Sequence, residues 1–72
     1  MSATNTILLY RQGGMWVGEH FGPKAQEVRE LFGTTVLPTP FSSIVSPGEV
    51  METVQSLNPH AVVAVLDVQP DD

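Results

Sequence analysis

Two apolar runs near the start of the chain flank a pair of glycines. The first run is Ile-Leu-Leu-Tyr at residues 7–10, the second is Met-Trp-Val at residues 15–17, and Gly13 and Gly14 lie between them. Both glycines can adopt a positive φ, which the tight turn of a two-residue hairpin loop requires. The pattern therefore predicts a β-hairpin.

The length of the hairpin loop determines which side chains share a face of the hairpin. A two-residue loop places Arg11 opposite Trp16 and Leu9 opposite Gly18, whereas a three-residue loop would shift this register by one residue. In the two-residue register, one face carries Leu8, Tyr10, Met15 and Val17, and the other carries Ile7, Leu9, Arg11, Trp16 and His20. Both faces are largely apolar, so we expect each of them to be covered.

A first amphipathic helix is predicted from Pro23 to about Phe32. Proline is favourable at the first helical position, and Gly33 is typical of the left-handed residue that ends a helix. The residues expected to face the core are spaced three and four apart: Ala25, Val28, Leu31 and Phe32.

A second helix is predicted from Pro47 to Leu57. Ser46 and Glu49 have the spacing of a capping box, in which serine accepts a hydrogen bond from the helix and glutamate reaches back. Asn58 is expected to end the helix in the left-handed conformation. The apolar stripe of this helix consists of Val50, Met51, Val54 and Leu57.

The stretch of residues 31–41, which includes the end of the first helix, contains two prolines. Residues 34–37 are predicted to be extended, and Pro38 and Pro40 lack a backbone N–H, so this segment cannot lie inside a sheet. We expect Phe41 to fill the bottom of the core below the second helix. The alternative is that the prolines hold Phe41 on the surface near Trp16.

The last apolar run, residues 61–66, is rich in valine and too short for a typical helix. It predicts a strand that is central in the sheet and buried on both sides. We expect residues 1–5 and 69–72 to be the flexible ends of a single domain that spans residues 1–72.

Together these elements predict a small two-layer α+β domain in the order ββα(β)αβ. The hairpin and the C-terminal strand would lie in a mostly antiparallel sheet with both helices on one face. Two helices can cover one face of a four-stranded sheet, so the face with Ile7, Leu9 and Trp16 would need a partner. The alternative places one helix on each face, which gives a three-layer monomer without such a surface.

The composition favours association. A chain of 72 residues buries only roughly 60 per cent of its unfolded surface, and this chain has no cysteine that could form a stabilising disulfide. Its residues are 42% hydrophobic and 15% charged, which is consistent with further apolar surface to bury in an oligomer. We expect a homodimer.

The net charge argues against a nucleic-acid partner, and the length of the longest apolar run argues against a membrane partner. The net charge is −5 with three lysines and arginines in total, too few to bind many phosphates of a nucleic acid. The apolar run at residues 61–66 is far shorter than the ~20 residues of a membrane-spanning helix. We therefore expect a soluble, cytoplasmic protein without nucleic-acid or membrane partners.

The sequence carries no specific catalytic or cofactor motif. Two imidazoles, His20 and His60, are too few for a metal site. Ser42 and Ser43 lack the strand-turn-helix context of a catalytic nucleophile, and the glycines do not have the spacing of a phosphate-binding loop. We expect no cofactor, no metal and no enzyme activity.

The favoured function is a non-catalytic protein-interaction module that homodimerises. The candidate surface for a partner or ligand consists of Ile7, Leu9, Arg11, Trp16, His20, Pro38, Pro40 and Phe41. Within this set, Trp16 could instead be a core residue beneath a helix. The alternative function is a small-molecule-binding regulatory domain, in which Trp16, His20 and Phe41 line a pocket.

Overall fold

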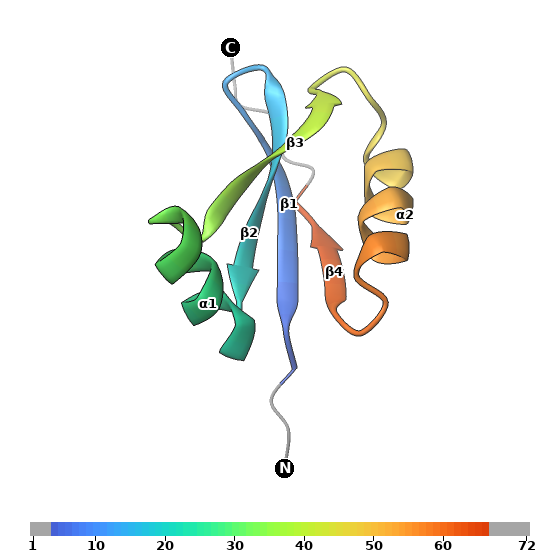
Figure 1. Ribbon diagram of the computed structural model, residues 1–72. Helices are drawn as coiled ribbons and strands as arrows, with labels where there is room; N and C mark the ends of the chain where they lie inside the picture. The colour runs from blue at the N-terminus through green and yellow to red at the C-terminus, as the bar shows by residue number, and fades with distance from the viewer. Residues whose placement is uncertain (1–3, 67–72) are drawn as a thin grey trace.

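The computed structural model describes residues 4–66, which form four strands and two helices (Figure 1). The elements in chain order are β1 (Thr6–Gln12), β2 (Met15–Phe21), α1 (Pro23–Phe32), β3 (Val36–Ser42), α2 (Pro47–Leu57) and β4 (Val62–Val65). This order confirms the predicted α+β class and the arrangement ββα(β)αβ. Of the predicted flexible ends, residues 1–3 and 69–72 lie outside the described part of the chain.

β1 and β2 form the predicted hairpin with the predicted two-residue loop. Gly13 and Gly14 have φ angles of 61° and 80°, and residues with a Cβ rarely adopt such angles. Arg11 lies opposite Trp16 and Leu9 opposite Gly18, so the predicted register is confirmed.

The sheet has the strand order β3-β2-β1-β4. β2 pairs antiparallel with β1 and β3, whereas β4 pairs parallel with β1, so the prediction of a mostly antiparallel sheet is confirmed. The prediction that residues 61–66 form a central strand is wrong, because β4 is an edge strand and Val62 and Leu66 are 52% and 48% exposed. β3 occupies the free side of β2, which leaves β4 the outer side of β1. A short valine-rich run does not show whether its strand lies at the edge or in the centre of a sheet.

β3 forms the opposite edge of the sheet and contains both prolines. It spans Val36–Ser42 and is therefore longer than the extended segment predicted at residues 34–37. Pro38 lies opposite Val17, next to a shift in the register of the ladder. An edge strand tolerates a missing N–H, so the prediction that this segment lies outside the sheet interior is confirmed.

The hydrophobic core forms on the predicted Trp16 face of the hairpin. Its buried members are Ile7, Leu9, Trp16, Val50 and Val54, and Phe41 packs against them. The Trp16 side chain is completely buried, and its Nε1–H donates a hydrogen bond to the Val45 carbonyl oxygen at 2.9 Å. The chain itself therefore covers this face, and the prediction that a partner must cover it is wrong.

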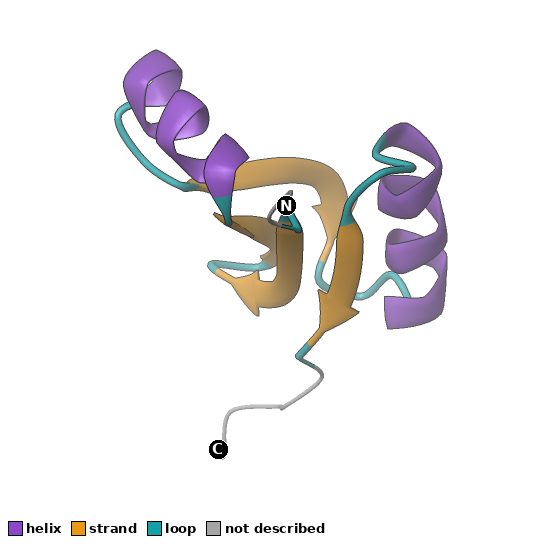
Figure 2. Ribbon diagram, turned by 90° about the horizontal axis from the view of Figure 1, so that it is seen from below, coloured by secondary structure: helices purple, strands orange, loops and turns teal. Residues whose placement is uncertain are grey.

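The two helices, which were predicted to cover one face of the sheet together, contribute unequally to the core on the Trp16 face. α2 supplies Val50 and Val54 to the core cluster, whereas none of the α1 residues, all of which are described, belongs to it. α1 contacts β2 and lies on the opposite side of the molecule from α2 (Figure 2). Leu31 and Phe32 are 77% and 62% exposed, so the prediction that they face the core is wrong. Their helix extends beyond the sheet that would have covered them.

Both helices have the predicted limits, but the caps of α2 differ from the prediction. Gly33 ends α1 with a φ of 77°, and its N–H donates to the Arg29 carbonyl oxygen. The side chain of Ser46 makes no capping hydrogen bond, so the predicted capping box is wrong. Asn58 is not left-handed, and its Nδ2 instead donates to the Val54 carbonyl oxygen at 2.9 Å. The spacing of a capping box permits its hydrogen bonds without requiring them, because serine has other rotamers.

We expect the substitution Trp16→Phe to lower the free energy of unfolding by about 2 kcal/mol, because it removes the donor to Val45 and leaves a gap in the core. Urea denaturation followed by circular dichroism measures this loss. Ile44→Ser is the matched control in the neighbouring loop, where Ile44 is 90% exposed, and should change the free energy by less than about 0.5 kcal/mol. Equal losses in both variants would contradict the assigned role of Trp16.

Candidate functional site

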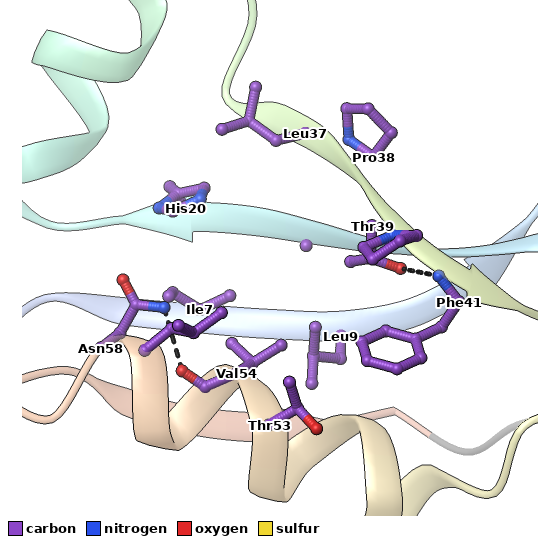
Figure 3. A pocket seen from close by; sticks show the side chains of 13 residues that line it. Ile7, Leu9, His20, Leu37, Pro38, Thr39, Phe41, Thr53, Val54 and Asn58 are labelled. Carbon is purple, nitrogen blue, oxygen red and sulfur yellow. Dashed lines mark hydrogen bonds between the residues drawn. The ribbon is translucent and has the colours of Figure 1, made fainter.

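A groove lies between β3 and α2, with strands β1 and β2 as its floor (Figure 3). We call it the β3–α2 groove, and its volume is about 320 Å³. The floor consists of Ile7, Leu9, Gly18 and His20. One wall is formed by residues 37–41 of β3. The other wall is formed by Thr53, Val54, Leu57 and Asn58.

The groove depends on the missing side chain at Gly18. A Cβ at this position would lie 3.2 Å from Ile7 Cγ2 and 3.5 Å from Leu9 Cδ2. Gly18 therefore leaves room above the floor that any other residue would fill. A glycine inside a strand often marks such a close approach, which is the sequence signal that could have identified this position.

Three polar side chains of the groove, those of Thr39, Thr53 and Asn58, form hydrogen bonds with the protein's own backbone. The Thr39 hydroxyl donates to the Trp16 carbonyl oxygen at 2.7 Å and accepts from the Phe41 N–H at 3.2 Å. Thr53 donates to the Glu49 carbonyl oxygen at 3.1 Å. Figure 3 shows the hydrogen bond from the Phe41 N–H to the Thr39 hydroxyl and the one from the Asn58 side chain to the Val54 carbonyl oxygen. These bonds leave mainly carbon atoms facing the space between the walls.

His20 lies at one end of the groove floor. Burial lowers the pKa of its imidazole below the ordinary value, and the positive charge of Lys24 lowers this pKa further. Both causes disfavour the protonated ring. His20 is therefore neutral at neutral pH, with one ring nitrogen as donor and the other as acceptor.

A second hollow adjoins the groove beyond His20, and we call it the basic pocket. Its volume is about 230 Å³, and its lining is Asn5, Ile7, His20, Lys24, Leu57, Asn58, Pro59, His60 and Ala61. Asn5 Oδ1 accepts a hydrogen bond from the Lys24 backbone N–H at 2.8 Å, and the Asn5 carbonyl oxygen accepts one from Val62 N–H at 2.9 Å. Asn5, predicted to be part of a flexible end, thus connects β4 to the start of α1.

The structure brings most of the predicted site residues together. Six of the eight line the β3–α2 groove, namely Ile7, Leu9, His20, Pro38, Pro40 and Phe41. Arg11 and Trp16 do not line it. The Arg11 guanidinium lies over the Trp16 ring, 4.3 Å from its centre, and Arg11 Nε donates to the Ser43 carbonyl oxygen at 2.9 Å.

Sequence reasoning did not identify the α2 wall of the groove. Val54 and Leu57 were assigned to the apolar stripe of the helix, and Val54 is indeed buried. Leu57 is 75% exposed and lies at the rim of both hollows. A helical stripe identifies the apolar side of a helix, but not where that side extends past its neighbours.

Within residues 4–66, no three His, Asp or Glu side chains are grouped in a way that could hold a metal ion. In the same part of the chain, no helix has the length and apolar character needed to cross a bilayer. Comparisons with protein-family models, curated proteins and solved structures found no match to this chain.

We expect the His20 imidazole to titrate below the ordinary pKa of about 6.5. As the pH falls, His20 is therefore protonated in the unfolded chain at a higher pH than in the folded protein. The stability contributed by neutral His20 is complete above about pH 6.5 and is lost as the pH falls from there to the lowered pKa.

An NMR titration of the imidazole resonances measures this pKa directly. In the variant Lys24→Met the pKa of His20 should rise but stay below 6.5, because burial remains the larger cause. Arg29→Met, on the same helix, is the control. An unchanged His20 pKa in Lys24→Met would contradict the proximity of the two side chains.

Proposed function

We propose that this protein is a non-catalytic binding module whose β3–α2 groove takes a small apolar molecule. The observation that carries the proposal is the groove itself, which has a volume of about 320 Å³ and walls formed by Leu37, Phe41 and Leu57. Ligand sites in proteins have volumes of roughly 300–1,000 Å³ and mainly apolar linings with a few polar groups. The size of this groove favours a small ligand.

The hydrogen bonds around the groove support binding rather than catalysis. Thr39, Thr53 and Asn58 each donate to a backbone carbonyl oxygen of their own chain. A catalytic group must reach a reacting atom of the substrate within hydrogen-bond distance. Side chains whose donors are engaged in this way instead maintain the shape of the walls.

The proposal includes a cytoplasmic location, since a fold without cysteine does not depend on an oxidising compartment. We also propose that the protein does not bind nucleic acid, because its net charge of −5 repels the phosphate backbone.

We expect octan-1-ol, a small neutral probe, to bind in the groove and to shift the NMR resonances of Leu37, Phe41 and Leu57. The substitution Leu57→Ser should weaken this binding by roughly fivefold, because it removes apolar contact at the rim. Leu57 is 75% exposed, so the variant should fold normally.

Leu31→Ser is the matched control, since Leu31 is 77% exposed near the end of the other helix. Its affinity for octan-1-ol should equal that of the original protein. If the alcohol shifts no groove resonance, or if both variants lose the same affinity, the proposed function is wrong.

A second candidate function is self-association through β4. This strand lies at the sheet edge, and its first residue, Val62, and the residue that follows it, Leu66, are about half exposed. An edge strand with exposed aliphatic side chains and no charge is a template for pairing with another chain. A second copy of this protein offers the same surface, which suits a twofold dimer.

We expect sedimentation equilibrium to detect a reversible dimer at concentrations on the order of 1 mM or lower, as for other weak interfaces. Val62→Lys should weaken this dimer by roughly tenfold, because it places a charge at the edge. Ile44→Lys adds the same charge at a residue that is 90% exposed and far from β4 in the chain, and should leave the dimer unchanged. A monomer at all concentrations would exclude this candidate.

A further inference from the structure

The basic side chains of this protein gather at one place. The whole chain has three lysines and arginines and two histidines, against eight acidic residues. Lys24, His20 and His60 all line the basic pocket, so three of these five basic groups face the same hollow. Among the described residues, no aspartate or glutamate lines either the basic pocket or the β3–α2 groove.

In the basic pocket, side chains rather than the backbone at the start of α1 offer groups to an anion. The backbone N–H of Lys24 already donates to Asn5 Oδ1, and the N–H of Ala25 donates to the Gly22 carbonyl oxygen. The groups that remain for a ligand are the Lys24 ammonium and the two imidazoles. An ammonium and an imidazole N–H both donate hydrogen bonds to a carboxylate.

The two hollows lie next to each other and share four lining residues. Ile7, His20, Leu57 and Asn58 line both of them. A molecule that extends past His20 and Leu57 would therefore have one end among basic side chains and the other between Leu37 and Phe41. Such a molecule must be charged at one end and apolar along the rest of its length.

Building on the proposed function, we propose that the ligand of the β3–α2 groove is a small amphiphilic monocarboxylate. Its carboxylate lies in the basic pocket near Lys24, His20 and His60, and its apolar body lies in the groove. The negative charge of the ligand offsets the positive charge that Lys24 places beside His20. The ligand is a small molecule, because the two hollows together have the size of a small-molecule site.

The test compares two molecules with the same apolar body, octanoate and octan-1-ol. Isothermal titration calorimetry at low salt should show that octanoate binds roughly tenfold more tightly than the alcohol. Lys24→Met should weaken octanoate binding by roughly fivefold and change octan-1-ol binding by less than about twofold. Arg29→Met removes a positive charge from the same helix outside both hollows and should alter neither affinity.

Each result separates this inference from the proposed function. If octan-1-ol binds in the groove and octanoate binds no more tightly, the groove takes a neutral ligand and the carboxylate inference is overturned. Equal weakening of octanoate binding by Lys24→Met and Arg29→Met would overturn it as well. If neither molecule binds, the proposed function itself fails. If a peptide with a free C-terminal leucine binds more tightly than octanoate, the small-molecule assignment is overturned, and the ligand is the C-terminus of a partner protein.

Discussion

The position of α2 depends on the interactions of a single buried residue, Trp16. Its indole N–H donates to the Val45 carbonyl oxygen, and its backbone carbonyl oxygen accepts from Thr39. Arg11 covers its ring and donates to the Ser43 carbonyl oxygen. β2 is thereby connected both to β3 and to the loop that leads into α2. Because this loop determines where α2 begins, the same contacts determine how far α2 lies from β3, which is the width of the groove.

The groove is open because its walls are stiff and its floor lacks one side chain. Pro38 and Pro40 restrict the backbone of the β3 wall, and Gly18 leaves the floor uncovered beside Ile7 and Leu9. A cavity with rigid walls needs little ordering when a ligand enters, so more of the contact energy contributes to affinity. The groove therefore follows from constraints on the backbone, and its polar side chains serve chiefly to maintain these constraints.

Local signals in the sequence predicted most of the elements and part of the site. The two glycines of the hairpin determined its register, and the register assigned Ile7, Leu9 and His20 to one face, which is why the groove floor was predictable. Strand order was not predictable for β4, because its place beside β1 results from contacts between distant parts of the chain. The exposure of Leu31 was missed for a related reason. An amphipathic pattern shows which side of a helix is apolar, whereas tertiary packing decides whether anything covers it.

The parallel pairing of β1 with β4 has a consequence for how the protein is made. β1 is a central strand, yet one of its two neighbours is β4, which leaves the ribosome after the other three described strands. Until residues 62–65 emerge, Ile7 and Leu9 have an open strand edge beside them, and the hairpin must persist without half of its final support. Closure of the sheet then requires contacts across most of the chain length, which are the slowest to form. A newly synthesised chain is therefore exposed to capture by chaperones or by other strands until residues 62–65 have emerged and paired with β1.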